Sequence, residues 1–449
     1  MNINDFTQGS EWRQILRFSL PMMLGNLFMQ LYQLVDTIIV GQSIGTEALA
    51  AVGASTPVVF MTTALVTGIG IGASVVISQY FGAKKIDRIQ KTSDTLFIFL
   101  LVMGAIVSIA GYFLSDDILR LMRLPVESLP MGTDYLQIYL GGSILLFGYN
   151  SVSAILRGLG DSKTPLYFLI IASVLNVILD LLFILTFDWG VKGAAWATIV
   201  SQGTSFLLSI WWVNRKSSLL RIDLLRLKFN NFIFGQCLRL GLPTGIQQVC
   251  VAVGMMALMG IVNKFGFEIT ASYTTAQRID SLIALPVMNF AAALTSFVGQ
   301  NMGAGNLTRI KRGLKATLLM TTITCLVINA FIILFGENIM MLFTNNPSVI
   351  KTGAECLVVL NSFYIIFGIM FIFNGMLRGV GATIFPMLTT LVALWFIRVP
   401  SAAYLSTEFG YTGIWWSFPI GWTVGMLGAV TYYLSGRWKK SGIIKTVKR

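Results

Sequence analysis

Long apolar segments recur along the whole chain, and they restrict its fold more than any other feature. A helix needs about 20 predominantly apolar residues to cross the hydrocarbon of a bilayer. About twelve such segments are present, near residues 14–38, 48–80, 95–114, 131–156, 165–187, 191–213, 236–261, 269–300, 314–335, 350–377, 384–405 and 411–434. The first is too long for the apolar region of a cleavable signal, so we expect it to be retained. The sequence predicts an all-α integral membrane protein with about twelve transmembrane helices.

Composition and charge placement agree with this class. The chain has 449 residues, of which 55% are hydrophobic and 11% charged, whereas soluble domains carry about 25% charged residues. The net charge is +13, and with the N-terminus inside, most Lys and Arg fall in cytoplasmic loops and in the tail. This positive-inside bias predicts that both termini are cytoplasmic, in the cell (inner) membrane. No polar segment is long enough to form a basic domain, so we expect no nucleic-acid partner.

Histidine is absent from the chain. Its absence excludes histidine-based acid–base catalysis and most catalytic zinc sites, and it leaves carboxylates as the groups able to relay protons. The four cysteines lie in apolar segments without pairing or metal-ligand spacing: Cys237, Cys250, Cys325 and Cys356. We therefore expect no enzyme activity, no cofactor, and no metal other than Na⁺.

The chain repeats itself at a shift of about 221 residues. LRFSLP at 16–21 recurs as LRLGLP at 238–243, and LRGLGDSKTP at 156–165 recurs as LRGVGATIFP at 377–386. Each half contains six apolar segments, an even number, so the halves have the same orientation in the membrane. We predict two parallel six-helix lobes, 1–213 and 236–449. The basic stretch between them, 214–235, is either a segment lying on the cytoplasmic surface or a plain connector.

Polar residues within the apolar segments differ between the two halves. The first half contains Asp36, Asn176, Asp180 and Thr198, where the second has Leu258, Ile397, Ser401 and Phe418. Asn176 and Asp180 are four residues apart and share one helix face. Two neighbouring buried carboxylates cannot both stay ionised and bare, so they share a proton or hold a small cation. This cluster is the predicted coupling site. The alternative is that each carboxylate only makes a structural hydrogen bond.

Further polar residues extend these faces. Met29, Tyr32 or Gln33, and Asp36 lie along one face of the first segment, and Gln202 belongs to a polar stripe in the sixth. We predict that Met29, Tyr32, Gln33 and Gln202 line the substrate cavity. The stripe also contains Ser205 and Ser209, for which we favour a role in helix packing.

The second half has buried charges of its own. Asp280 and Arg398 lie within apolar segments, and opposite charges in such segments usually pair, so we predict a structural ion pair between them. Pro21 and Pro243 occupy matching places in the two halves and predict helix kinks.

Two glycine motifs imitate nucleotide-binding sequences. GLGDSKT at 158–164 has Ser162 where a phosphate-binding loop needs glycine, and TGIGIGAS at 67–74 lies in an apolar segment. Its glycines more simply allow close helix packing.

Motifs in both halves resemble those of the multidrug and toxic compound extrusion (MATE) family. They are VDTIIVGQSIGTEALAAVG at 35–53 and RGLGDSKTP at 157–165, with SFVGQNMGAG at 296–305 and MLRGVGAT at 376–383 as second-half counterparts. The resemblance implies a twelve-helix antiporter that exports small organic, often cationic, compounds in exchange for H⁺ or Na⁺. It also implies that Asp36, Asn176, Asp180 and Thr198 form the first-lobe cation site, that helix 1 bends on cation binding, and that the protein acts as a monomer in the bilayer.

The family's second-lobe carboxylates lie in spans seven and ten, and residues 236–261 and 356–377 of this chain contain no acidic residue, which favours the DinF-like branch over the NorM-like one. One rival function is a flippase for lipid-linked oligosaccharides, but only Arg278 and Arg398 could line its cavity with positive charge. An intramembrane aspartyl protease is another, but no span carries a G-x-G-D motif. An antiporter coupled to H⁺, with Na⁺ as the alternative ion, remains our interpretation.

Overall fold

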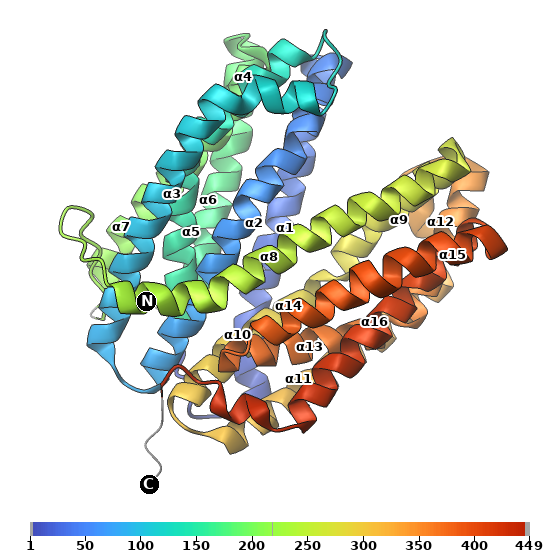
Figure 1. Cartoon of the computed structure of the whole chain (residues 1–449). Helices are drawn as coiled ribbons and strands as arrows, with labels where there is room; N and C mark the ends of the chain where they lie inside the picture. The colour runs from blue at the N-terminus through green and yellow to red at the C-terminus, as the bar shows by residue number, and fades with distance from the viewer. Residues whose placement is uncertain (1–2, 218, 445–449) are drawn as a thin grey trace. The chain divides into compact units, whose positions relative to one another are not determined.

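The structure is a computed structural model that describes residues 3–217 and 219–444, and every regular element among them is a helix (Figure 1). The helices of the first half follow one another with short connections. They are α1 (Glu11–Ser43), α2 (Thr46–Gly82), α3 (Ile86–Leu121), α4 (Leu129–Gly141), α5 (Ser143–Gly158), α6 (Lys163–Asp180), the π-helical η1 (Leu181–Thr186) and α7 (Gly190–Lys216).

The second half repeats this plan with more interruptions. Its helices are α8 (Asn231–Val262), the 3₁₀-helical η2 (Asn263–Phe265), α9 (Phe267–Ile283), α10 (Leu285–Gly303), α11 (Leu307–Met341), α12 (Pro347–Ser362), α13 (Tyr364–Val380), α14 (Ile384–Leu391), the π-helical η3 (Val392–Arg398), α15 (Val399–Phe409), α16 (Tyr411–Leu434) and the 3₁₀-helical η4 (Arg437–Lys440).

The predicted spans are present as helical passes of membrane length. Among the described residues, seven helices are long and apolar enough to cross a bilayer, and three bent pairs raise that number to ten. The helices α7 and α16 are of similar length and complete six passes in each half. Both helices contain several tryptophan, glycine and polar residues, which lower their mean hydropathy. The all-α, two-lobe architecture is therefore confirmed.

Three of these passes are broken, which the apolar pattern does not reveal. The helices α4 and α5 meet at an angle of 47°, α12 and α13 at 52°, and α9 and α10 at 41°. The breaks at Gly142 and Phe363 are 221 residues apart, the same shift that relates the two halves of the sequence. The repeat thus extends to a matching bend in the fourth and tenth passes, whereas the bend near Ala284 has no counterpart in the continuous α2.

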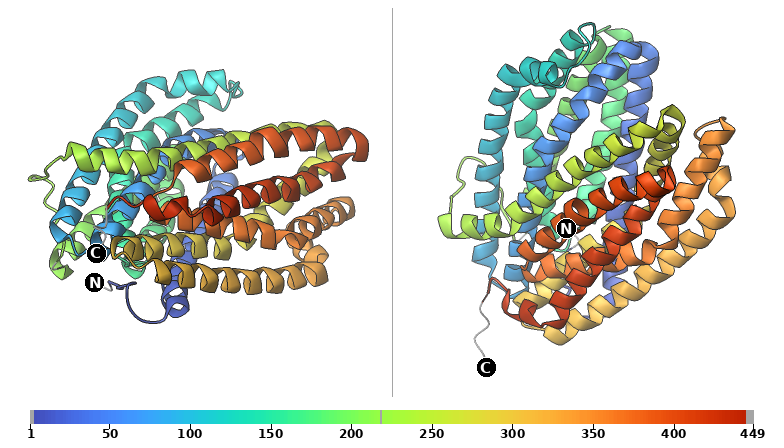
Figure 2. Two further views of the ribbon diagram at one scale, coloured as in Figure 1. Left: turned by 60° about the horizontal axis from the view of Figure 1, so that its bottom comes forward. Right: turned by 45° about the vertical axis from the view of Figure 1, so that its right-hand side comes forward.

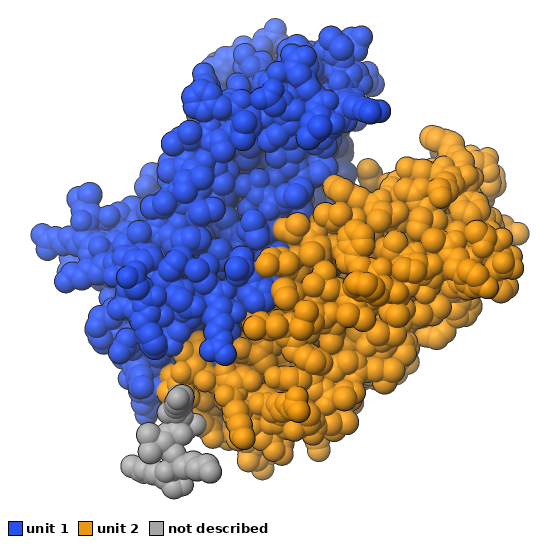
Figure 3. Space-filling model, viewed as in Figure 1, with its two compact units in different colours: residues 1–4, 21–245 blue, residues 5–20, 246–449 orange. Residues whose placement is uncertain are grey.

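The chain separates into two compact units, each built mainly from one half. Unit 1 contains Met1–Asn4 and Pro21–Gly245, and unit 2 contains Asp5–Leu20 and Ile246–Arg449 (Figure 3). These boundaries differ from the predicted division at 214–235, because the first part of α1 belongs to unit 2 and the first part of α8 to unit 1. In α1 the change of unit falls between Leu20 and Pro21, and in α8 it falls two residues after Pro243.

Glycines allow α2 and α8 to pack closely within unit 1. A Cβ atom added at Gly68 would lie 2.3 Å from the backbone nitrogen of Gly245, and one at Gly72 would lie 2.5 Å from that of Gly241. Gly68 and Gly72 are four residues apart on α2, as Gly241 and Gly245 are on α8. The two pairs face each other where the helices cross, as small residues do in membrane helix pairs. This contact confirms that the glycines of TGIGIGAS serve packing.

The predicted connector is held to the first turns of α3 in unit 1. The Gln90 side chain donates to the carbonyl of Arg221 at 2.7 Å and accepts from its backbone N–H at 3.1 Å. The Asn214 side chain likewise donates to the carbonyl of Ile222 and accepts from its backbone N–H, both at 2.7 Å. The connector therefore follows the surface of the first lobe rather than hanging freely.

The N-terminal segment is anchored on unit 2 by Arg309. Its guanidinium donates to the carbonyl oxygens of Phe6 and Gln8 at 2.8 and 2.7 Å, and it forms an ion pair with Glu11 at 3.2 Å. The ring of Phe6 is fully buried and packs edge-on against Phe18 at 5.1 Å. The first turns of α1 are thereby fixed to the second lobe, while Asp36 on the same helix belongs to the first.

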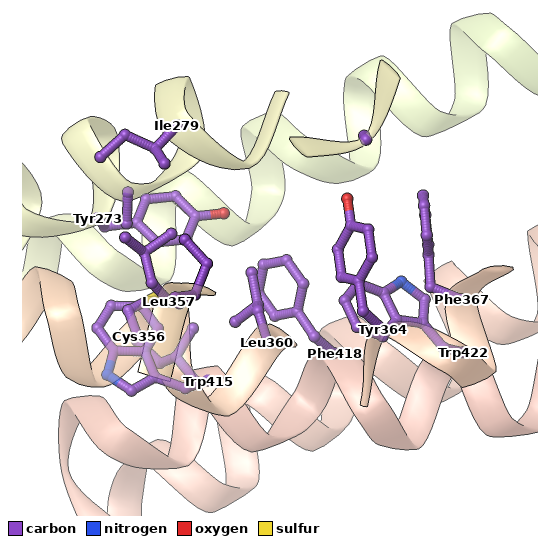
Figure 4. Close-up of a cluster of buried hydrophobic side chains, with 14 of the residues drawn as sticks. Tyr273, Ile279, Cys356, Leu357, Leu360, Tyr364, Phe367, Trp415, Phe418 and Trp422 are labelled. Carbon is purple, nitrogen blue, oxygen red and sulfur yellow. The ribbon is translucent and has the colours of Figure 1, made fainter. Parts of the chain in front are cut away.

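Aromatic side chains form the core of unit 2. Tyr273 stacks on Trp415 with ring centroids 5.5 Å apart, and Tyr364 contacts Trp422 edge-on at 5.9 Å (Figure 4). The cluster joins α9, α12, α13 and α16 and includes Leu357, Leu360 and Phe418. Aromatic rings of this size bury a large apolar area, so they hold the broken passes of this lobe together.

Candidate coupling site

Two carboxyl groups from different helices meet in the first lobe. Asp36 lies on α1 and Asp180 is the last residue of α6, and their side chains are within hydrogen-bonding reach of each other. Asp180 is fully buried and Asp36 is half-buried. One oxygen of each, Oδ1, is buried without a hydrogen-bond partner. Two carboxylates this close repel each other unless they share a proton or hold a cation, as the sequence predicts.

Asn176 links this pair to α7. With its amide oriented as its neighbours require, Nδ2 donates to Oδ2 of Asp180 at 3.3 Å and Oδ1 accepts from the backbone N–H of Thr198 at 3.3 Å. The hydroxyl of Thr198 donates to the carbonyl of Ala194 at 3.1 Å. Asn176 and Thr198 are buried, with 2% and 9% of their surfaces exposed. The structure thus brings together all four residues that the sequence selects for the coupling site.

The helix changes its geometry directly after Asp180. The π-helical turn η1 begins at Leu181 and ends at Thr186. Such turns are rare, lengthen the backbone hydrogen bond to i→i+5, and occur frequently at functional sites. No signal for this turn is evident in the apolar run LLFILT.

Tyrosines complete the surroundings of the carboxyl pair. Tyr32 of α1 and Tyr135 and Tyr139 of α4 are close enough to interact electrostatically with Asp36. Tyr135 and Tyr139 stack with ring centroids 5.9 Å apart. These two residues were not predicted from the sequence because the charge beside them, Asp134, lies near the start of its span, where it forms an ion pair with Lys192 at 3.1 Å. Their spacing of four residues on one helix face is the signal that could have indicated them.

The predicted cavity residues fall into two groups. Tyr32 faces the carboxyl pair, and Gln202 is half-buried on α7. Met29 and Gln33 are exposed on α1, Met29 with 37% of its surface accessible. Ser205 donates to the carbonyl of Phe168 on α6 at 2.7 Å, which confirms its packing role.

The second lobe does not form the predicted contact between Asp280 and Arg398. Among the described residues no ion pair of 4.0 Å or less joins them, and Nε and Nη2 of Arg398 and Oδ1 of Asp280 have no hydrogen-bond partner. The guanidinium instead lies 3.4 Å from the ring centroid of Phe418. The ring face interacts favourably with this cation, and Arg398 is the last residue of the π-helical turn η3. Arg278, in contrast, is exposed.

We propose that Asp280 and Arg398 stabilise each other across this longer distance. We expect Asp280→Asn to lower thermal stability, because Arg398 then loses the nearby opposite charge. The loss should be smaller than the about 3–5 kcal/mol typical of a contacting buried pair, and the double variant with Arg398→Gln should recover part of it. Thermal unfolding of the four proteins in detergent measures this, with the exposed Glu408→Gln as the control. Strictly additive losses would show that the two residues act independently.

Comparison with known proteins decides the family. The MatE family model matches residues 21–182 and again residues 243–404, once in each half. The chain belongs to the MatE family. The two matches begin at Pro21 and Pro243, so the internal repeat and the family's own duplication coincide.

Similar proteins cover this MATE chain from end to end. It is 35% identical over 440 residues to "Probable multidrug resistance protein YpnP" of Bacillus subtilis, covering 98% of both chains. It is 27% identical to "Probable multidrug resistance protein NorM" of Thermotoga maritima, covering 96% of this chain and 94% of the relative. A solved structure described as the outward-facing conformation of a multidrug resistance MATE family transporter of the MOP superfamily has a TM-score of 0.90, with 28% identity and 97% of both chains covered. The protein is therefore a multi-span MATE transporter.

Proposed function

We propose that this MATE protein is a secondary-active exporter of small organic compounds, often cationic, and that the carboxyl pair of Asp36 and Asp180 couples export to cation entry. The single observation that carries the proposal is that two intramembrane carboxyl groups from separate helices lie within hydrogen-bonding reach. Intramembrane carboxylates are costly and mark ion and proton pathways. A pair that must gain or lose a cation to remain stable can link ion binding to the positions of α1 and α6.

We infer that the coupling ion is H⁺. Asp36 and Asp180 lie within hydrogen-bonding reach of each other, so one proton can bridge their carboxyl groups. A sodium ion would instead require several oxygen ligands around it, as hard cations do. A proton shared between the two carboxyl groups needs no further ligand. The site therefore supports protons more directly, and Na⁺ remains the alternative ion.

The remaining features of the proposal concern the membrane and the substrate path. We propose that both termini face the cytoplasm in the cell membrane, that the transporter acts as a monomer, and that it stands closer to the DinF-like branch. Tyr32, Met29, Gln33 and Gln202 supply adaptable polar and apolar contacts for substrates of varied shape, and bending of α1 and α8 at Pro21 and Pro243 accompanies the transport cycle.

Reconstituted transport tests this function. The purified full chain in proteoliposomes, given opposed H⁺ or Na⁺ gradients, should accumulate a fluorescent quaternary ammonium dye against its own gradient. Protein-free liposomes provide the background rate. Gradient-driven movement of a lipid-linked oligosaccharide, without movement of the dye, would instead support the flippase function.

A further inference from the structure

A groove opens on the surface of unit 2 between α11 and α12, far from the carboxyl pair in sequence. Its volume is about 440 Å³, within the range of about 300–1,000 Å³ typical of small-molecule pockets. The shorter helix α12 packs beside α11 (Figure 2). The lining residues are Ile332, Ile333, Leu334, Gly336, Glu337, Asn338, Lys351, Ala354, Glu355, Val358 and Val359.

Three charged side chains line this groove without neutralising one another. Glu337 of α11 and Lys351 and Glu355 of α12 are exposed. Among the residues that the structure describes, no ion pair of 4.0 Å or less and no side-chain hydrogen bond involves any of the three. The groove therefore offers one unpaired ammonium and two unpaired carboxylates to a ligand.

The order of polarity along the groove matches that of a phospholipid. Glu337 lies in the last turns of α11 and Lys351 in the first turns of α12, on either side of the short turn at 342–346. Val359 lies eight residues farther along α12, about 12 Å deeper at 1.5 Å per residue, and Ile332 and Ile333 lie correspondingly deeper on α11. Helices that cross a bilayer place such turns at the headgroup level and the following residues in the hydrocarbon. The charged end thus meets headgroups and the apolar end meets acyl chains.

We propose that this groove binds a phospholipid whose headgroup carries both a phosphate and a primary ammonium, as in phosphatidylethanolamine. The ammonium of Lys351 would bind the phosphate, and the carboxylates of Glu337 and Glu355 would accept hydrogen bonds from the lipid ammonium. A headgroup with phosphate alone would face two like charges, and a choline headgroup has no N–H to donate. The site is separate from the coupling site and does not depend on the proposed function.

Lipid retention by the full chain tests the proposal. The purified protein is mixed in detergent with phosphatidylethanolamine, phosphatidylcholine or phosphatidylglycerol of identical acyl chains, and bound lipid is counted by native mass spectrometry. We expect the ethanolamine lipid to bind about tenfold more tightly than the choline lipid, the scale of one charged hydrogen bond. Lys351→Ala should weaken its binding by about the same factor.

Matched variants separate this groove from other lipid contacts. Lys264→Ala removes an exposed lysine at the turn before α9, which lies on the same side of the lobe because Ser348 at the start of α12 bonds Glu268 at the start of α9. This control should bind lipid as the unmodified protein does. The double variant Glu337→Gln with Glu355→Gln should lose the preference for phosphatidylethanolamine and bind more phosphatidylglycerol than the unmodified protein does. Equal binding of ethanolamine and choline lipids, equal effects of Lys351→Ala and Lys264→Ala, or a preference for phosphatidylglycerol in the unmodified protein would each overturn the proposal.

Discussion

We expect Asp36→Asn and Asp180→Asn each to abolish gradient-driven export while leaving the protein folded. The two carboxyl groups lie within hydrogen-bonding reach of each other, and an amide in place of either one can neither release a proton nor complete a cation site. The amide keeps the size of the side chain and removes a like-charge repulsion, so stability should be unchanged or slightly higher. A loss of transport with intact stability distinguishes a coupling group from a structural one.

Transport rates and thermal unfolding are to be measured on the same preparations. Asp87→Asn is the control, because Asp87 forms an exposed ion pair with Lys91 at 2.8 Å, and such pairs contribute only about 0–1 kcal/mol. Counterflow, the exchange of labelled for unlabelled substrate without an ion gradient, should persist in both site variants if substrate binding is intact. Export at the unmodified rate by either variant would show that its carboxylate is structural.

The four-residue site could be predicted because simple rules connect its members. Asn176 and Asp180 share a helix face by spacing, and comparison of the two halves isolates the polar residues that only the first half contains. The architecture could be predicted for the same reason, because the length of the apolar segments predicts helices that cross the membrane and the internal repeat predicts two lobes.

Features that depend on tertiary packing were not accessible in this way. The tyrosines Tyr135 and Tyr139 reach the carboxyl pair through the packing of α4. Their spacing places them on one helix face, but it does not specify which helix that face meets. Asp280 and Arg398 do not form the predicted contact: opposite charge alone predicts a partner, but it does not reveal that the Arg398 guanidinium lies 3.4 Å from the ring centroid of Phe418. The assignment of the first turns of α1 to unit 2 likewise follows from tertiary contacts, those of Arg309 with the N-terminal segment.

The identity of the coupling ion leads to the second large expected effect. We expect full transport with a proton gradient alone and no dependence on Na⁺. The reason is geometric: two adjacent carboxyl groups can share a proton directly, without any further ligand. If the protein exchanges H⁺ for substrate, a smaller proton gradient should give a smaller accumulation of the substrate.

The test uses proteoliposomes with an acidic interior in buffers from which Na⁺ is rigorously excluded. Protons leaving the lumen should drive a permanently charged quaternary dye inward, and a permanent charge prevents the passive trapping that affects weak bases. Membrane potential is held at zero with K⁺ and valinomycin, so that only the pH difference acts, and vesicles containing Asp180→Asn define leakage. In the opposing arm the lumen contains Na⁺ at equal pH on both sides. Accumulation only in that arm would identify a sodium antiporter, with the amide of Asn176 turned to bind the ion, and would refute the proton assignment.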